Sequence, residues 1–390
     1  MRLFLIIFFL FYGGMHLYAF LKAKAVFAFG AYTGLCVALF MLAMLFAPVI
    51  VRSCENAGLE GFARIMSYIG YTWMGVLFLF ISCSFVIDSY RIIVHMGGLI
   101  LKRDLSYMTL SEKYAFFIPL ALSMLISVYG YFEAKDIRTE RIVLKSPKIP
   151  AEAGRVRIVQ ISDVHLGLIA GQERLKRILK EVKKADPDIL VSTGDLVDGQ
   201  INGLRGLAEM LREIKPGYGK FAVTGNHEFY AGLSHALNFT EKAGFTVLRG
   251  DAVTIDGLIN IAGVDDPHGK AFGLFRGVSE KELLSGLPAG KFTLFLKHRP
   301  LIDKDALGLF DLQLSGHVHK GQIFPFSLLT GLYYHPVQAG FADLARNSHL
   351  YVSRGSGTWG PPIRFLMSPS RIASAISTNT SSNAAMYAST

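Results

Sequence analysis

The chain is poor in cysteine and tryptophan, with three cysteines and two tryptophans among its 390 residues. Cys36, Cys54 and Cys83 all lie in or beside the apolar first part of the chain, so the remainder has no disulfide. This distribution is compatible with a reducing compartment. The chain also lacks a Ser or Cys inside a G-x-S-x-G elbow, which argues against hydrolysis through a protein nucleophile of that type.

A dense block of Lys and Arg is absent too, although the net charge is +10. Residues 1–132 hold nine basic and five acidic side chains, a balance of +4, and the remainder holds 31 and 25, a balance of +6. The basic side chains are interleaved with Asp and Glu instead of clustering on one element. We therefore expect no nucleic-acid partner.

The first part of the chain is rich in long apolar runs. Each approaches the roughly 20 residues that a helix needs to cross the hydrocarbon core of a bilayer. They cover residues 3–21, 25–51, 65–87 and 114–132. We predict a bundle of about four transmembrane helices within residues 1–132. Apolar residues continue past Asp88 to Leu101, which is compatible with a longer third helix or with a segment lying on the membrane surface.

The orientation of this bundle follows from the basic residues that flank the spans. With four spans both ends of the bundle lie on one side, and that side carries eight basic residues against six on the other. The small excess favours a cytoplasmic C-terminal domain. One span fewer would reverse this orientation.

From about Arg155 the pattern changes to short apolar runs separated by polar helical stretches or Gly-containing loops. Strands are predicted at 155–161, 188–193, 220–224, 258–262, 292–297, 311–315 and 349–353. Alternation of strands and helices predicts an α/β domain over residues 155–367, with both sheet faces covered. We interpret residues 133–154 as a juxtamembrane linker and residues 368–390 as a disordered tail.

Polar side chains follow five of the predicted strands, at the point where each strand ends. They are Asp163 and His165, Asp195 and Asp198, Asn226 and His227, His298, and His317 with His319. Because ligands of open α/β sheets lie beyond the carboxyl ends of the strands, we expect these side chains to converge.

This set contains carboxylates, an amide and imidazoles, and no thiol. Such ligands suit Mn, Fe or Zn, and there are more of them than one tetrahedral ion needs. Two divalent ions with a bridging carboxylate would use them all. Paired metals about 3.5–4 Å apart activate a water and stabilise both oxygens of a phosphoryl displacement.

The same residues form five motifs whose order and spacing resemble the calcineurin-like metallophosphoesterase superfamily, in particular its membrane-associated bacterial branch. The motifs are D-x-H ending at His165, GDLVDG around Asp195, GNHE from Gly225 to Glu228, LKHRP around His298, and GHVH ending at His319. The resemblance covers about residues 155–360. It implies a four-layer αββα sandwich and, with the apolar runs, an integral protein of the bacterial inner membrane.

The resemblance also implies a role for each polar side chain. It divides the metal ligands into Asp163, His165 and His319 for the first ion and Asn226, His298 and His317 for the second, with Asp195 bridging both. His227 would protonate the leaving oxygen, and Asp198 would orient the His227 imidazole. A positioned imidazole typically contributes about 10²–10⁴ in rate.

Simpler interpretations exist for several of these residues. Asp is a frequent residue in turns, so Asp163 and Asp195 could each be simple turn residues. Turn formation does not readily explain why such polar side chains follow five separate strands. Asp198 and Glu228 are also compatible with capping a helix or with tying down a loop. Asp265 and Asp266 either line the cleft or form a turn.

Two features that follow the GHVH motif have alternative explanations. Relatives commonly have Gly where this chain has Lys320, which affects either backbone shape or substrate contact. Residues 321–341 are apolar for a segment beside a charged site, so they either contact lipid or complete the core.

The function we expect is a membrane-anchored, dinuclear metal-dependent phosphodiesterase or pyrophosphatase with a lipid-linked or envelope-related substrate. Its expected partners are the lipid bilayer and this phosphoester. The alternatives are a phosphatase or phosphodiesterase for soluble nucleotides, and a catalytically silent sensing module on a membrane anchor.

Overall fold

The chain forms two compact units. The computed structural model describes residues 2–199, 204, 206–255, 257–334, 337–367 and 370–378. The helical unit comprises residues 1–132 together with 360–365, and the α/β unit comprises the rest. All three cysteines lie in the helical unit as free thiols.

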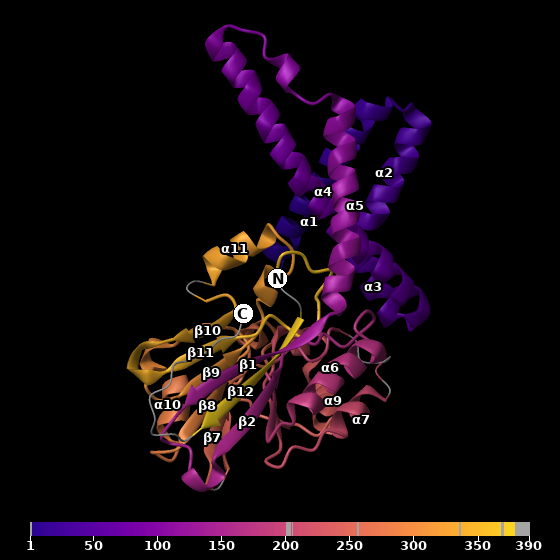
Figure 1. Cartoon of the computed structure of the whole chain (residues 1–390). Helices are drawn as coiled ribbons and strands as arrows, with labels where there is room; N and C mark the ends of the chain where they lie inside the picture. The colour runs from indigo at the N-terminus through magenta and orange to yellow at the C-terminus, as the bar shows by residue number, and fades with distance from the viewer. Residues whose placement is uncertain are drawn as a thin grey trace. The chain divides into compact units, whose positions relative to one another are not determined.

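Long apolar runs become long helices in the helical unit (Figure 1). α1 (Arg2–Phe27), α4 (Glu60–Leu101) and α5 (Glu112–Lys135) are long and apolar enough to cross a membrane. A further candidate is the pair α2 (Ala31–Leu45) and α3 (Ala47–Asn56), which bends by 56°. By length and composition the described residues hold three spans, or four if the bent pair is one span. The third apolar run is part of a single long helix, as one of its two interpretations required.

Helices α1, α4 and α5 share one buried apolar cluster. Its members include Tyr12, Met15, Leu77, Phe80 and Phe116. Glycine allows the closest helix approach, because a Cβ on Gly70 would lie 2.4 Å from the Cβ of Ala47. The backbone of α4 therefore packs directly against the start of α3.

The predicted domain of residues 155–367 is interrupted by residues 360–365, which belong to the helical unit. The physical reason is that two glycines leave the helix backbone uncovered by side chains, so residues 363 and 364 can pack against it. A Cβ on Gly75 of α4 would lie 2.8 Å from Ile363, and one on Gly130 of α5 would lie 2.6 Å from the Arg364 carbonyl oxygen. The amide of Arg364 also donates to the carbonyl of Gly130 at 2.9 Å.

The α/β unit is built on two six-stranded sheets. The first has the order β1-β12-β2-β3-β4-β5. Its strands are β1 (Ile137–Lys145), β2 (Arg155–Ile161), β3 (Ile189–Ser192), β4 (Lys220–Ala222), β5 (Thr246–Val247) and β12 (Ser370–Thr378). Strands β2 to β5 are parallel, and β12 runs antiparallel to β2.

The second sheet has the order β10-β11-β9-β8-β7-β6. Its strands are β6 (Asp251–Ile255), β7 (Ile259–Gly263), β8 (Phe292–Leu296), β9 (Leu312–Ser315), β10 (Gly340–Asp343) and β11 (His349–Val352). The four inner strands are parallel, and both edge strands are antiparallel to their neighbours. All seven predicted strands are present, with ends shifted by at most two residues.

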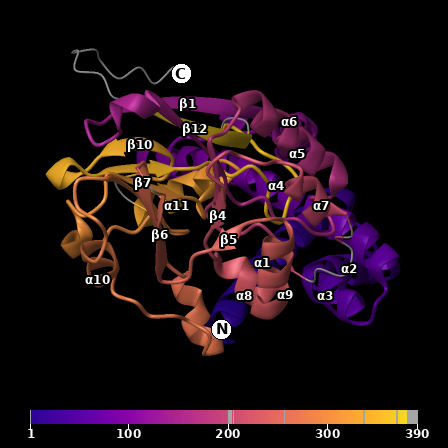
Figure 2. The same cartoon turned by 90° about the horizontal axis from the view of Figure 1, so that it is seen from below.

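The two sheets stack between helices, which confirms the predicted four-layer sandwich (Figures 1 and 2). Helices α6 (Gln172–Ala185), α7 (Leu207–Arg212) and α9 (Leu233–Lys242) pack on the first sheet through a core that includes Leu175 and Ile178. The facing sides of the sheets form a second core, with Val191 and Leu294 among its members. Helix α10 (Glu280–Ser285) and Phe310 cover the other face of the second sheet.

Two boundaries differ from those predicted. Residues 137–145, expected in the linker, form strand β1, and residues 370–378, expected in the tail, form strand β12. The two segments pair with each other in parallel over nine residues, and β12 also pairs with β2. Each strand therefore depends on a partner that is distant in sequence. Residues 379–390 of the predicted tail lie outside the described residues.

Candidate metal centre

The predicted site residues lie where five strands end. Those from the first sheet follow β2, β3 and β4, and those from the second sheet follow β8 and β9. Asn226 and His227 begin the short helix α8 (Asn226–Tyr230), and His319 begins the 3₁₀ turn η5 (His319–Gly321). The sandwich thus brings together side chains that are up to 156 residues apart, from Asp163 to His319.

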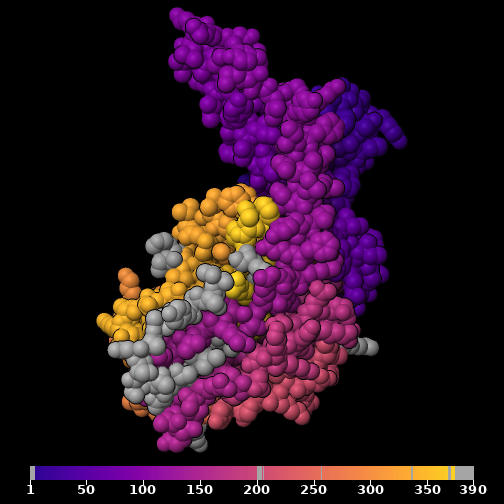
Figure 3. All heavy atoms as spheres, in the orientation of Figure 1, coloured from indigo at the N-terminus to yellow at the C-terminus, as the bar shows by residue number. Residues whose placement is uncertain are grey.

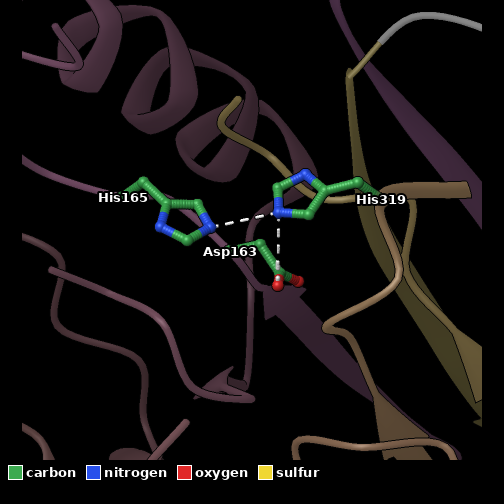
Figure 4. Close-up of side chains that lie close together, drawn as sticks. All are labelled: Asp163, His165 and His319. Carbon is green, nitrogen blue, oxygen red and sulfur yellow. Dashed lines mark hydrogen bonds and ion pairs between the residues drawn. The ribbon is translucent and has the colours of Figure 1, made fainter. Parts of the chain in front are cut away.

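Asp163, His165 and His319 form one buried group (Figure 4). The Nε2 atoms of the two histidines lie 3.1 Å apart, and Nε2 of His319 lies 3.6 Å from Oδ1 of Asp163. Potential ligand atoms of all three lie within 4.8 Å of one another. This is the set that the resemblance assigns to the first ion.

Asp195, His298 and His317 form a second group. Oδ2 of Asp195 lies 3.2 Å from Nε2 of His298, which in turn lies 3.1 Å from Nδ1 of His317. The same Asp195 oxygen lies 3.9 Å from Nε2 of His165 in the first group. Its carboxylate therefore stands between the two groups, where a bridging ligand is expected.

Asn226 is also buried, and its Oδ1 has no hydrogen-bond partner among the residues that the structure describes. An unpartnered buried amide oxygen is costly unless something binds it. A divalent cation would satisfy this oxygen, so the donor set fits the metal ions that the sequence predicts. The role of all seven residues as ligands stays a prediction.

Five of the proposed ligands have a left-handed backbone. The φ angles are between 49° and 73° for Asp163, His165, Asp195, His317 and His319. This region costs a non-glycine residue roughly 1–2 kcal/mol. Accumulated strain of this kind is typical of functional sites, because surrounding structure must impose it.

Lys320 follows the same pattern, with φ 54°. Glycine adopts this conformation at little cost, which explains why a Gly suits the position. Lys320 therefore affects the backbone shape here, and its contact with substrate stays a prediction. Burial and the nearby charges of Arg354 and Arg371 lower the pKa of the Lys320 ammonium.

Glycines allow the strand ends to close around the site. A Cβ on Gly225 would lie 2.2 Å from Oδ1 of Asp195. A Cβ on Gly316 would lie 1.9 Å from Oγ of Ser162 and 2.3 Å from Oδ2 of Asp163. Gly225 and Gly316 are therefore required by the close approach of a carboxylate.

Glu228 ties two of the loops together. Its carboxylate accepts hydrogen bonds from the backbone amides of Asp195 at 2.9 Å, Leu196 at 2.8 Å and Gly225 at 2.6 Å. Burial, followed by the charge of Asp195, raises the pKa of Glu228. The hydrogen bond from Gly225 caps the start of α8, and those from Asp195 and Leu196 tie down the loop after β3, so the structure supports both interpretations.

Carboxylates and imidazoles of the site shift one another's pKa. Burial opposes ionisation of Asp195, but His298 and His227 hold the pKa of Asp195 well below its usual value. Burial likewise opposes a charge on His298, yet Asp195 raises the pKa of His298 to about 10. A divalent ion competes with protons for such donors, so metal binding here would release protons.

His227 lies beside both metal groups and is held by Asp198. Its Nδ1 is 2.7 Å from Oδ1 of Asp198, and its backbone amide donates to Oδ1 of Asp195 at 2.8 Å. The Asp198 carboxylate also lies 3.4 Å from Nδ1 of His165. His227 further shares a compact group with His165 and Asp195. The geometry agrees with Asp198 as the residue that orients His227.

Several supporting contacts were not predicted from the sequence. Ser162 donates a hydrogen bond from Oγ to Asp163. The carbonyl of Thr193 lies 2.7 Å from Nδ1 of His298, which leaves Nε2 directed at Asp195. Such contacts orient metal-binding side chains. A Ser or Thr shortly before an Asp at a strand end is common in proteins, so the sequence contained no specific signal for these two contacts.

Asp265 and Asp266 are buried anchors for arginines. Asp265 binds Arg249 through both carboxylate oxygens, at 2.8 and 2.7 Å. Asp266 binds Arg299 in the same way, at 2.7 and 3.2 Å. Arg299 directly follows the ligand candidate His298, so its guanidinium is fixed beside the site. The sequence alone did not single out Arg299.

Aromatic rings surround the two groups. Ring centroids lie 5.3 Å apart for His227 and Tyr230, and 6.0 Å apart for His227 and Trp359. The ring of Tyr334 lies 5.7 Å from that of His317. Trp359 is half exposed, at 52%.

Comparison with known proteins identifies the family. Residues 156–321 match the family model described as calcineurin-like phosphoesterase. An uncharacterized metallophosphoesterase of Aquifex aeolicus is 40% identical over 250 residues, which are 64% of this chain and 95% of that protein. One from Campylobacter jejuni is 32% identical over 324 residues, 78% of this chain and 82% of that protein.

A relative from Danio rerio, a transmembrane protein with a metallophosphoesterase domain, is 30% identical over 259 residues. The match covers 63% of this chain and 59% of that protein. The chain therefore belongs to the calcineurin-like metallophosphoesterases, which are metal-dependent phosphoester hydrolases.

Proposed function

We propose that this protein is a membrane-anchored phosphoester hydrolase that uses two divalent metal ions of the Mn, Fe or Zn type. The observation that carries the proposal is the position of Asp195. Its carboxylate lies between two groups of potential ligands, 3.2 Å from His298 and 3.9 Å from His165. A single ion would occupy only one of these groups of potential ligands.

The residues of the chain would act as follows. Asp163, His165 and His319 would hold one ion, Asn226, His298 and His317 the other, and Asp195 both. When bound, such ions polarise the phosphoryl group and supply a nucleophilic water at neutral pH. Nδ1 of His227 is occupied by Asp198, so Nε2 is the atom that would give a proton to the leaving oxygen. Because Asp198 stays ionised, it favours the protonated imidazole needed for that transfer.

The substrate we propose is a phosphodiester or diphosphate carried by a lipid. Helix α11 (Phe326–Tyr333) contains no charged residue, and its side chains Leu328, Leu329, Leu332 and Tyr333 are 60–80% exposed. Figure 3 shows this segment in orange on the surface of the α/β unit. Exposed apolar clusters are typical of lipid or partner contacts. Of the two interpretations of residues 321–341, these side chains favour lipid contact.

Helix α11 is also joined closely to the metal centre. It follows the turn that carries His319, and a Cβ on Gly321 would lie 2.4 Å from the Cα of Ser327. Tyr334 at its end packs against His317. A lipid held by this helix would therefore bring its phosphate near both groups of ligands.

The test is a substrate screen with the purified, Mn-loaded, full-length protein. It is incubated with a lipid extract and with soluble phosphodiesters and nucleotides, and released phosphate or head group is measured. We expect release from a lipid substrate. Hydrolysis of soluble nucleotides alone would favour the alternative substrate class, and no hydrolysis with two bound metal equivalents would indicate a silent sensing module.

A paired variant tests the lipid contact directly. Leu329→Ser with Leu332→Ser should lower activity on a bilayer substrate about tenfold and leave a soluble phosphodiester unaffected. Leu274→Ser, at a site that is 47% exposed elsewhere on the α/β unit, is the matched control. Equal loss on both substrates would contradict the role of α11.

A further inference from the structure

The helical unit contains a charged cavity that the hydrolytic function does not use. Its volume is about 1020 Å³. Its walls are formed by Lys22 of α1, by the last four turns of α4 and by the loop that follows α4. All of these residues lie in the helical unit, so the cavity is separate from the metal centre.

The charges at this cavity leave a small positive excess. Its walls carry four cationic side chains, Lys22, Arg91, Lys102 and Arg103, two carboxylates, Asp88 and Asp104, and His95, which is counted as neutral. Lys22 pairs with Asp88 at 2.8 Å, and Arg91 pairs with Glu112 of α5. Counting Glu112, four positive and three negative charges give a balance of +1. One anionic group would neutralise it.

A tight helix end holds the loop over the cavity. The amide of Arg103 donates to the carbonyl of Gly98 at 3.0 Å, and Lys102 has a left-handed φ of 51°. A Cβ on Gly98 would lie 2.9 Å from the carbonyl oxygen of Arg103. Glycine therefore allows the chain to turn back, which brings Lys102 and Arg103 to the cavity wall.

Helix α4 is longer than the hydrocarbon core of a bilayer is thick. The helix has 42 residues, or about 63 Å at 1.5 Å per residue, whereas the hydrocarbon core is about 30 Å thick. Its charged last third cannot lie in hydrocarbon together with the apolar first part. Ile92, Ile93 and Ile100 in this last third are 63–76% exposed, as expected for a helix segment that lies in the membrane interface. Figure 3 shows the end of α4 as a projecting lobe.

We propose that this cavity binds the phosphodiester head group of an anionic lipid. A phosphodiester carries one negative charge, which matches the balance of +1, and basic pockets between membrane helices are suited to such head groups. Apolar wall residues such as Val94 and Leu105 would contact the glycerol and upper acyl region. The inference rests on the membrane anchoring in the proposed function and is independent of hydrolysis.

The experiment measures lipid bound to the full-length protein in detergent by native mass spectrometry. The protein is titrated with phosphatidylglycerol or with phosphatidylcholine of the same acyl chains. We expect retention of one phosphatidylglycerol and at least tenfold weaker retention of phosphatidylcholine. Lys102→Gln with Arg103→Gln should weaken phosphatidylglycerol binding about tenfold. Both side chains are exposed, so the fold should be kept.

The control variant is Lys24→Gln with Lys113→Gln, which removes two cations of the helical unit that do not line the cavity. It should bind phosphatidylglycerol like the unchanged protein. Equal binding of both lipids, or equal weakening in both double variants, would overturn the proposal. Displacement of the lipid by inorganic phosphate would instead assign the cavity to a soluble anion. Since the readout is bound mass, failure of hydrolysis would not affect it.

Discussion

Oδ1 of Asp198 lies 2.7 Å from Nδ1 of His227, and this contact fixes which ring nitrogen of His227 is available to a substrate. The carboxylate holds the proton on Nδ1 and favours a positive imidazole. Burial opposes that charge, but Asp195 and Asp198 raise the pKa of His227 to about 9. The pair therefore has the arrangement expected of a proton donor and its orienting group.

The first prediction concerns the proton donor. His227→Gln should lower kcat for a phosphodiester with an alkyl leaving group by about 10²–10⁴, because the departing alkoxide needs a proton. The loss should be much smaller with a p-nitrophenolate leaving group, which departs without one. Asp198→Asn should lower kcat for both substrates, by a smaller factor than His227→Gln does. Steady-state kinetics on the two substrates provide the measurement.

Metal content separates this role from metal binding. Both variants should keep the metal stoichiometry of the unchanged protein, measured by elemental analysis. Equal losses on the two substrates, together with lost metal, would make His227 a ligand instead of the acid.

The second prediction concerns the bridging carboxylate. Asp195→Asn should reduce the content of both ions, whereas Asn226→Ala should reduce one only, because Asp195 alone lies between the two groups. Elemental analysis after dialysis against a fixed Mn²⁺ concentration measures the stoichiometry. If both variants lost the same number of ions, the bridging role would be wrong.

The third prediction concerns the anchor between loops. Glu228→Gln replaces an acceptor of three amide hydrogen bonds by a group that can donate, which leaves buried amides unsatisfied. The free energy of unfolding should fall by about 1–3 kcal/mol. Chemical denaturation measures it, and Glu173→Gln on the exposed side of α6 is the control. An unchanged midpoint would show that the three contacts do not stabilise the fold.

The fourth prediction concerns the glycines of the motifs. Gly225→Ala and Gly316→Ala should each abolish metal binding, because a Cβ would lie within 2.4 Å of Asp195 or Asp163. Gly217→Ala, where a Cβ meets no atom within 4 Å, should behave like the unchanged protein. Calorimetric titration with Mn²⁺ distinguishes the three. Normal binding by Gly316→Ala would mean that the loop relaxes at little cost.

The fifth prediction concerns Arg299. Asp266 accepts from two of the five N–H donors of Arg299, and Tyr334 is a further hydrogen-bond partner of this guanidinium. We expect a remaining donor to bind a substrate oxygen. Arg299→Gln should raise KM about tenfold for a diphosphate and change it little for a monoester, since only the former has a second phosphate. Arg299→Lys should raise KM for the diphosphate less than Arg299→Gln does, because Lys keeps the positive charge but lacks the forked N–H donors of the guanidinium. Similar KM changes on both substrates would place Arg299 at the reacting phosphate.

Local patterns accounted for most of the secondary structure and for the membership of the candidate site. Val- and Ile-rich runs such as 155–161 became strands because their side chains are buried on both sheet faces. Parallel strands align their carboxyl ends, so residues after β2 and β9 meet although they are far apart in the sequence. The apolar runs similarly became helices, in which each backbone amide finds its partner within the same run.

Tertiary structure decided what depends on partners distant along the chain. Polar segments 137–145 and 370–378 form strands because each completes the other's hydrogen bonds. Residues 360–365 leave the α/β unit because Gly75 and Gly130 offer bare helix backbone. Arg299 is held beside the site by Asp266, a contact for which sequence spacing gives no signal. The sequence by itself determined which chemical groups are present and at which strand ends they lie. Only the folded chain decided which atoms touch, because those contacts depend on packing at the level of single ångströms.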